Sequence, residues 1–314
     1  MEELVILSGK GGTGKTSVAA SFAALAQNAV IADADVDAAD LHLVLNPEIQ
    51  SRHEFRSGHE AIIRQEDCLR CGACLAHCRF EAVKMDGTEA GEATFTIDSI
   101  ACEGCGVCVA LCPVEAIDFP ERSCGEWYES RTRFGPMIHA RLKPAGENSG
   151  KLVTQVRTAA RQRAEREGRD VIVVDGPPGI GCPVIASVTG ASTVLAVTEP
   201  TVSGAHDLAR LLKLTKHFGV PSFICVNKWD INTAVTEQIE HQAAAAGATV
   251  AGRIPYDRAV TAAQVNGQPV VTFSTGPAAQ SIRQLWEDFR IVGQASSLSV
   301  VNNGQPRWSS HQNP

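Results

Sequence analysis

Residues 9–16 read Gly-Lys-Gly-Gly-Thr-Gly-Lys-Thr, and this stretch decides the fold. It directly follows an apolar run at Leu4–Leu7 and leads into a helical pattern at Thr16–Gln27, which is the setting that a phosphate-binding loop requires. The glycines allow successive backbone N–H groups to face phosphate oxygens, and the start of the helix adds positive potential. A generic glycine-rich turn is the competing interpretation, but it does not account for the full eight-residue match. The sequence therefore predicts a nucleotide site.

The positions of this loop have distinct expected roles. Lys15 should reach the β- and γ-phosphates, and the hydroxyl of Thr16 should bind Mg²⁺. The residues expected to contact the nucleotide are Gly11, Gly12, Thr13, Gly14, Lys15, Thr16 and Ser17.

Short apolar runs alternate with helical patterns along most of the chain. The helical patterns include 150–167, 205–218 and 234–246, and the runs are Leu4–Leu7, Ala29–Ala32, Val171–Val174, Thr193–Val197 and Phe223–Val226. Runs of this length are typical of parallel strands that are covered on both faces. The predicted fold is therefore α/β, with a doubly wound, mainly parallel sheet.

Acidic residues follow two of the predicted strands. Asp33-Ala34-Asp35 ends the second run, and Asp175 begins Asp-Gly-Pro-Pro-Gly after the third. Carboxylates at the C-terminal ends of strands beside a P-loop lie where Mg²⁺ and an attacking water need them. The alternative interpretation is that they cap the helices that follow.

Eight of the eleven cysteines form two copies of one spacing, Cys-x2-Cys-x2-Cys-x3-Cys, which is that of bacterial ferredoxins. In this pattern the first three cysteines of a run bind one [4Fe–4S] cluster, and the fourth binds the other cluster. Zinc is the competing metal, but triplets at this spacing overfill its tetrahedron. The predicted ligands are Cys68, Cys71, Cys74 and Cys112 for cluster 1, and Cys102, Cys105, Cys108 and Cys78 for cluster 2.

Three cysteines lie outside these runs. Cys225 is in the middle of an apolar run, so we expect it to be a buried apolar side chain. Cys182, just after the Asp175 segment, is either a buried structural thiol or a thiol that faces a dimer partner or cargo. The sequence indicates no role for Cys124.

The alternation of strands and helices breaks between about Gly58 and Pro120, where cysteines and glycines replace it. The polar composition from about Gly293 onward is typical of a disordered tail. The predicted organisation is the first part of a P-loop ATPase domain at 1–57, an inserted two-cluster ferredoxin module at 58–120, a connector and the rest of the ATPase domain at 121–293, and a disordered tail at 294–314.

Composition narrows the class of protein. A formal net charge of −7 and a pI near 5.7 argue against non-specific nucleic-acid binding. The chain has no run of 18 apolar residues and no signal-peptide pattern at its start, so we expect a cytoplasmic protein that neither spans nor binds a membrane. In that compartment, clustered cysteines indicate metal rather than disulfides.

Together these motifs resemble the MinD-superfamily P-loop ATPases that contain an inserted ferredoxin domain, relatives of the Mrp iron–sulfur carrier ATPases. The resemblance covers residues 1 to about 290 and includes 125–127, 130–136, 139–142 and 147–153, for which the residues alone indicate no chemistry. It implies a homodimer in which Lys10 reaches the partner's nucleotide and stabilises transition-state charge as an arginine finger does.

The resemblance also implies roles for the carboxylates. Asp35 would orient the attacking water, Asp33 would lie near the Mg²⁺ shell, and Asp175 would bind Mg²⁺ in a Walker B position. Lys10, Lys15 and Asp35 are therefore the predicted catalytic residues.

The identity of the base rests on two segments. Asn227-Lys228-Trp229-Asp230 spells the N-K-x-D pattern with which P-loop GTPases bind guanine, where Asp230 would accept hydrogen bonds from the base. The resemblance favours ATP instead, with Asn227 contacting adenine and a loop at 254–257, which includes Pro255, backing it. A strand-end turn without base contact is the third interpretation.

Two functions follow from the resemblance. The favoured one is an ATP-hydrolysing protein whose dimer cycle is coupled to electron delivery through two [4Fe–4S] clusters, with a partner similar to the nitrogenase-cofactor carriers or the orange proteins. The alternative is an ATP-dependent carrier or assembly factor for iron–sulfur or mixed-metal clusters. Mrp scaffolds of that kind have a further Cys-x-x-Cys late in the chain, and this sequence has none outside the insertion. A spatial-positioning protein would need a membrane-binding tail or a basic DNA-binding surface.

Overall fold

The computed structural model describes residues 1–87, 93–144, 146 and 148–301, with side chains described as far as Phe289. Its main body is a nine-stranded sheet of order β13-β12-β11-β1-β10-β2-β9-β8-β3. The strands from β13 to β9 run parallel, and β8 and β3 are antiparallel additions at one edge. Their bounds are β1 Glu2–Ser8, β2 Ala29–Asp33, β3 Glu48–His59, β8 Glu121–Thr132, β9 Gly135–Leu142, β10 Val171–Pro178, β11 Thr193–Thr198, β12 Ser222–Asn227 and β13 Thr249–Ile254.

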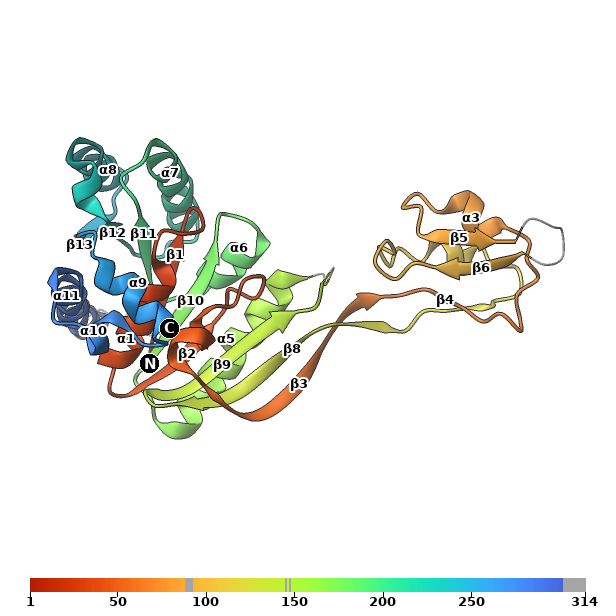
Figure 1. Ribbon diagram of the computed structural model, residues 1–314, viewed down its shortest axis with the longest axis horizontal. Helices are drawn as coiled ribbons and strands as arrows, with labels where there is room; N and C mark the ends of the chain where they lie inside the picture. The colour runs from red at the N-terminus through yellow and green to blue at the C-terminus, as the bar shows by residue number, and fades with distance from the viewer. Residues whose placement is uncertain (88–92, 145, 147, 302–314) are drawn as a thin grey trace, which may run out of the picture.

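Helices cover both faces of this sheet, which confirms the predicted α/β architecture (Figure 1). Side chains alternate along β1, so Leu4 and Ile6 pack into one layer and Val5 and Leu7 into the other. One layer holds α1 Lys15–Leu25, α2 Leu41–Leu45, α9 Arg258–Val265, α10 Val270–Phe273 and α11 Pro277–Val301. The other holds α5 Ser149–Glu167, α6 Cys182–Val188, α7 Val202–His217 and α8 Thr233–Ala245.

The segment 121–148 differs from the expected connector, because most of it forms strands. β8 and β9 pair with each other as a hairpin, and β8 also pairs with β3, more than 60 residues earlier in the chain. Strand formation here depends on this long-range partner and on packing against the sheet, so the local pattern does not reveal it.

The antiparallel pair β3 and β8 continues beyond the sheet as an arm that leads to a small separate body (Figure 1). Two short antiparallel pairs and two one-turn helices make up this body, around a small core that includes Val83, Phe95 and Ile117. The elements are β4 Ile62–Ile63, α3 Ala73–His77, β5 Val83–Asp86, β6 Thr94–Ile97, α4 Val107–Ala110 and β7 Ile117–Asp118.

The C-terminal segment also differs from its prediction. α11 continues to Val301, so residues 294–301 are helical rather than part of a disordered tail, and residues 302–314 lie outside the described part of the chain. Extending an existing helix adds one hydrogen bond per residue without a new nucleation step, so a polar segment can continue it. Among the described residues, no helix is long and apolar enough to cross a membrane.

Candidate functional site

A cavity of about 620 Å³ opens at the C-terminal ends of the parallel strands. Every residue from Gly11 to Ser17 lines it, as expected from the sequence. Asp35 borders it beyond β2, and the segments after β12 and β13 contribute Asn227 and Pro255. In a doubly wound fold, this edge of the sheet is where nucleotides bind.

The loop itself is held in a conformation that glycine permits. Gly12 and Gly14 have φ values of 80° and 89°, in the left-handed region. A Cβ atom on Gly14 would lie 2.3 Å from the Nδ2 atom of Asn227. That same Nδ2 donates a hydrogen bond of 2.8 Å to the carbonyl of Thr13, so Asn227 fixes the loop from the far side.

Lys15 lies at the centre of a buried group of charges. Its Nζ atom is 2.8 Å from Oδ1 of Asp175 and 3.2 Å from Oδ2 of Asp35, and its side chain is only 6% exposed. Burial alone would lower the pKa of Lys15, but Asp175 and Asp35 outweigh it and raise that pKa. A fixed positive charge therefore faces the cavity, beside two carboxylates.

The carboxylate of Asp33 is engaged by the backbone, and its place near the Mg²⁺ shell stays a prediction. Its two carboxylate oxygens accept hydrogen bonds of 3.2 Å from the backbone N–H groups of Asp35 and Leu41. Complete burial and the neighbouring Asp175 raise the pKa of Asp33 well above its ordinary value. Asp33 thus orders the segment that carries Asp35, and it does not line the cavity.

Two buried polar atoms in this region have no hydrogen-bond partner among the described residues. They are Oδ2 of Asp175 and Oγ1 of Thr13. A buried polar atom without a partner is costly, so such atoms commonly mark the place of a bound group. The free carboxylate oxygen of Asp175 fits a Mg²⁺ ion, and the free hydroxyl of Thr13 in the P-loop fits a phosphate.

Lys10 leaves the P-loop in another direction. Its Nζ atom donates hydrogen bonds to Oγ1 of Thr201 at 3.3 Å and Oγ of Ser203 at 3.2 Å, and it lies 3.6 Å from Oε2 of Glu199. These three residues lie at the start of α7 and just before it. Lys10 is therefore not among the residues that line the cavity of its own chain.

At the base end of the cavity, Asp230 is engaged with the backbone. Its Oδ1 accepts a hydrogen bond of 2.7 Å from the N–H of Tyr256, so it anchors the loop that contains Pro255. Pro255 and Asn227 line the cavity, whereas Asp230 is not one of the lining residues. This placement gives Asp230 a part in holding the loop, and its contact with a base stays a prediction.

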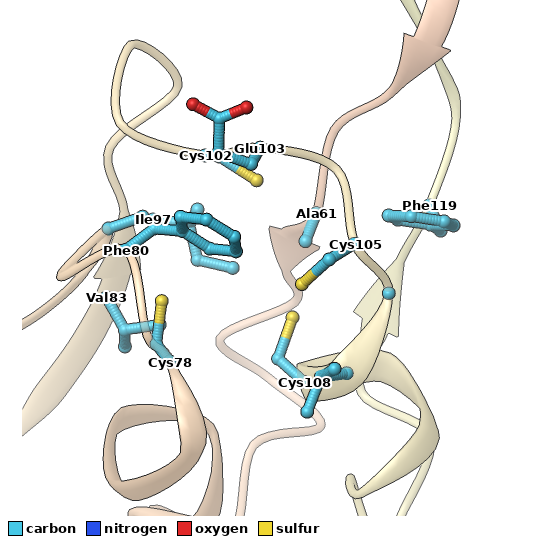
Figure 2. A pocket seen from close by; sticks show the side chains of 13 residues that line it. Ala61, Cys78, Phe80, Val83, Ile97, Cys102, Glu103, Cys105, Cys108 and Phe119 are labelled. Atoms are coloured by element: carbon cyan, nitrogen blue, oxygen red, sulfur yellow. The ribbon is translucent and has the colours of Figure 1, made fainter.

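The eight clustered cysteines gather in two separate cavities of the small body. One is lined by Cys78 from the first run with Cys102, Cys105 and Cys108 from the second, and Figure 2 shows these four side chains around one space. The other is lined by Cys68, Cys71 and Cys74 with Cys112 from the second run. The two sets have the membership predicted for clusters 2 and 1. Their ligation of metal remains a prediction.

The surroundings of these thiols are apolar with nearby backbone donors. Phe80 and Ile97 line the first cavity, and Phe95 and Ile117 the second. Burial would raise the pKa of Cys78, but backbone N–H groups from residues 80–83 outweigh this and lower that pKa. Sγ of Cys112 accepts a hydrogen bond of 3.3 Å from the N–H of Ala116. Such donors stabilise the thiolate form, which is the form that binds metal.

Within the described residues, no group of three or more His, Cys, Asp or Glu side chains converges closely enough to hold a single metal ion. A cubane cluster differs from a single ion because its four irons occupy the space between the thiolates. Four cysteines spaced around a cavity are the donor set that such a cluster needs.

The family of the chain follows from comparison with known proteins. The CobQ/CobB/MinD/ParA nucleotide binding domain matches residues 4–270, which includes the P-loop and both carboxylate segments. The chain belongs to the MinD/ParA family.

Relatives of this MinD/ParA protein include two from Methanocaldococcus jannaschii. Uncharacterized protein MJ0578 is 38% identical over 235 residues, which cover 73% of this chain and 79% of that protein. Uncharacterized protein MJ0579 is 24% identical over 240 residues, which cover 74% of this chain and 83% of that one.

Solved MinD structures share the fold. The cell division ATPase MinD of Pyrococcus furiosus superimposes with a TM-score of 0.55 at 16% identity, over 93% of this chain and 99% of that one. MinD of Pyrococcus horikoshii complexed with Mg-ADP gives a TM-score of 0.55 at 16% identity, over 94% and 98% of the two chains. At such identities the likeness shows the shared fold alone.

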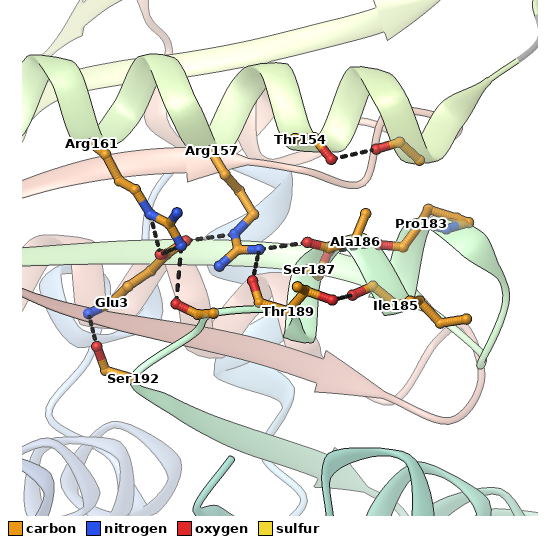
Figure 3. A network of polar contacts seen from close by, with 12 residues as sticks. Glu3, Thr154, Arg157, Arg161, Pro183, Ile185, Ala186, Ser187, Thr189 and Ser192 are labelled. Atoms are coloured by element: carbon orange, nitrogen blue, oxygen red, sulfur yellow. Dashed lines mark hydrogen bonds and ion pairs between the residues drawn. The ribbon is translucent and has the colours of Figure 1, made fainter. Parts of the chain in front are cut away.

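A buried ion-pair network ties α6 of the MinD/ParA body to the sheet (Figure 3). Nε of Arg157 donates to Oε1 of Glu3 at 2.6 Å, and Nε of Arg161 donates to Oε2 of Glu3 at 2.7 Å. Arg157 also donates to the carbonyls of Ala186 and Thr189 at the end of α6. The sequence did not indicate this network, which fixes the end of the helix that follows the Asp175 segment.

Gln264 also contributes to the site without a sequence signal, whereas Tyr256 lies in the loop at 254–257 that the resemblance indicated. Gln264 of α9 donates a hydrogen bond of 2.8 Å to Oγ of Ser17, and it lines the nucleotide cavity together with Tyr256. These residues come from a helix and a loop that are distant in sequence, so only the fold brings them to the P-loop.

The three remaining cysteines differ in exposure. Cys225 is fully buried, as expected, and burial raises its pKa to about 12. Cys124 is buried in β8 and its thiol donates to the carbonyl of Ser57 at 3.1 Å. Cys182 is exposed at the start of α6, which excludes the interpretation of a buried structural thiol.

Proposed function

We propose that the chain is an ATPase whose nucleotide cycle opens and closes a homodimer and thereby controls electron delivery from two [4Fe–4S] clusters to a partner protein. The observation that carries this proposal is the presence of a P-loop cavity and two four-cysteine cavities in one chain, joined by the arm of β3 and β8.

The nucleotide part assigns a role to each charged residue. Lys15 would move from Asp175 and Asp35 to the β- and γ-phosphates, because a phosphate offers it more negative charge. Its departure frees the carboxylate of Asp175 for Mg²⁺, which Thr16 would bind from the P-loop. Asp35, released in the same step, faces the cavity and would orient the attacking water.

Lys10 would complete the site of a second subunit. In its own chain it lies outside the cavity, held by Glu199, Thr201 and Ser203 beside the P-loop. A partner that brought its γ-phosphate to this surface would offer Lys10 a stronger counter-charge than Glu199 does. Hydrolysis would then require the closed dimer.

ATP is the proposed substrate rather than GTP. The guanine pattern requires the carboxylate of Asp230 to face the base, and here that carboxylate accepts from the N–H of Tyr256. Asn227 and Pro255 do line the cavity, in the positions that the resemblance gives to adenine contacts.

Residues 58–120 form the proposed ferredoxin module. Cys68, Cys71, Cys74 and Cys112 would hold cluster 1, and Cys102, Cys105, Cys108 and Cys78 would hold cluster 2. The bound clusters would supply one-electron transfer. The chain's own residues exclude water with apolar side chains and direct backbone N–H groups at the sulfur atoms, which lowers the cost of holding negative charge.

The charge of this module indicates the chemistry of the partner. Residues 58–120 contain eleven acidic and four basic residues, so they account for the whole net charge of −7. Leu69, Ile100 and Val107 are exposed apolar side chains on the same module. A redox or metal-cofactor carrier protein with a basic rim around an apolar centre would complement this surface.

Anaerobic purification tests the proposal. We expect a brown protein with about eight irons and eight sulfides per chain and a Mg²⁺-dependent ATPase activity. Stoichiometric zinc without iron would contradict the ferredoxin module. Release of intact clusters to an apo-acceptor on ATP addition, without electron transfer, would favour the cluster-carrier alternative.

A further inference from the structure

The segment 130–136, Ser-Arg-Thr-Arg-Phe-Gly-Pro, spans the end of β8, the turn and the start of β9, and five of its residues line a cavity of about 200 Å³. Two of its arginines, Arg131 and Arg133, face two more, Arg163 and Arg169, from α5 and the turn after it. Among the described residues, Glu167 is the only acidic residue that lines this cavity, and Glu129 binds Arg163 at 2.9 Å from outside the lining. The lining therefore has a surplus of positive charge.

The four guanidinium groups differ in how they are held. Glu167 binds both Arg163 and Arg169, the latter at 2.9 Å. Arg133 donates to the carbonyl of Gly267 at 3.3 Å. The side chain of Arg131 has no hydrogen-bond or ion-pair partner among the residues that the structure describes, so its guanidinium donors remain open for a ligand.

The turn that carries Arg131 and Arg133 is fixed by its own contacts. Oγ1 of Thr132 donates to the carbonyl of Gly135 at 2.9 Å and accepts from the N–H of Phe134 at 3.1 Å. Gly135 has a φ of 143°, and a Cβ there would lie 2.9 Å from the carbonyl oxygen of Ala29. The arginines thus project from a backbone that is already ordered, which reduces the entropy lost on binding.

This cavity is distinct from the nucleotide site. β9 begins at Gly135 and runs parallel to β2, so the turn lies at the N-terminal edge of the parallel strands, whereas the P-loop follows the C-terminal end of β1. The structure shows an indirect link between them, since Gly267 follows α9, whose Gln264 contacts Ser17 in the P-loop helix.

We infer that this arginine cavity binds an oxyanion of phosphate size, either free or as a phosphate monoester. Guanidinium groups present planar pairs of N–H donors that match the oxygens of phosphate. Arg131 supplies the open donors, and Arg163, Arg169 and Arg133 supply surrounding charge already held in place. The inference is independent of the iron–sulfur proposal, because it uses only residues of the main body.

Calorimetric titration with inorganic phosphate tests this inference. The titration uses the full anaerobic protein carrying Lys15→Ala, which removes phosphate binding at the P-loop. A parallel titration with glycerol 3-phosphate distinguishes the two sources. Tighter binding of inorganic phosphate indicates a free ion, and tighter binding of glycerol 3-phosphate indicates a phosphate monoester. We expect saturable binding with one site per chain, weakened about tenfold or more by Arg131→Ala and less by Arg131→Lys, since one charged hydrogen-bonding group is lost.

Arg210→Ala is the matched control, because Arg210 is an exposed arginine of α7 that does not line the cavity. It should leave the affinity for phosphate nearly unchanged. Failure to detect phosphate binding in the Lys15→Ala protein, or equal losses with Arg131→Ala and Arg210→Ala, would overturn the inference. Thermal unfolding of each variant shows whether the exposed Arg131 matters for the fold.

Discussion

The nucleotide cavity and the cysteine cavities are built in opposite ways. In the first, Lys15, Asp35, Asp175 and Asp33 are buried and already paired with one another or with the backbone. In the second, thiols stand around apolar space in a body with a small core, and Cys71 and Cys105 are exposed. The nucleotide cavity can therefore hold its shape without a ligand, whereas we expect the cysteine cavities to gain much of their order from bound clusters.

The largest expected effect follows the loss of Lys15, which lies at the centre of the buried charges beside the nucleotide cavity. Lys15→Ala should weaken Mg-ATP binding about a hundredfold or more, because it removes the positive charge that would face the phosphates and leaves the carboxylates of Asp35 and Asp175 unpaired. Fluorescent-nucleotide titration measures this, with Lys216→Ala on exposed α7 as the control. Retained affinity in Lys15→Ala would show that the cavity binds something other than a nucleoside triphosphate.

The cysteine cavities should respond to the loss of a single cysteine. Cys105→Ala should reduce the iron content from about eight to about four per chain, because the two cavities have separate cysteine sets. Mg-ATP affinity should not change. Cys124→Ala is the matched control, since Cys124 is buried and lies outside both cavities. Equal iron loss in both variants would mean that the loss follows from unfolding rather than from ligation.

Removing the metal should separate the two regions further. After chelation of iron, we expect limited proteolysis within residues 58–120 to become about tenfold faster or more, because the small core alone cannot keep that module folded. The main body should remain intact and keep its affinity for Mg-ATP. Uniform cleavage along the chain would contradict the independence of the two regions.

The smallest expected effect concerns the base. Asp230→Asn should change the preference for ATP over GTP by no more than about twofold, because the amide oxygen can still accept from the N–H of Tyr256. Competition binding with both nucleotides measures it. If Asp230→Asn bound GTP much more weakly and other nucleotides more tightly, Asp230 would be a guanine contact.

The sequence predicted the features that arise from local patterns, and it missed those that the whole fold sets. The P-loop, the strands that flank it and the cysteine spacing are local patterns, and the structure gathers Cys78 with Cys102, Cys105 and Cys108 as predicted. The pairing of β8 with β3 and the position of Lys10 depend on partners distant in sequence, and the backbone bonds of Asp33 depend on the folded course of the segment up to Leu41. Physical reasoning from local periodicity does not reach these, since strand pairing and burial are set by the whole fold.

The most direct test of the account is whether nucleotide controls electron transfer. The anaerobic protein, reduced with dithionite and freed of excess reductant, is mixed with oxidised cytochrome c, a basic one-electron acceptor, with and without Mg-ATP. We predict that ATP changes the rate of cytochrome reduction several-fold in the wild type, because it favours the closed dimer, and has no effect in Lys10→Ala, whose nucleotide affinity should be only modestly reduced. A wild-type rate that is the same with and without ATP, in a preparation that hydrolyses ATP, would contradict the coupling.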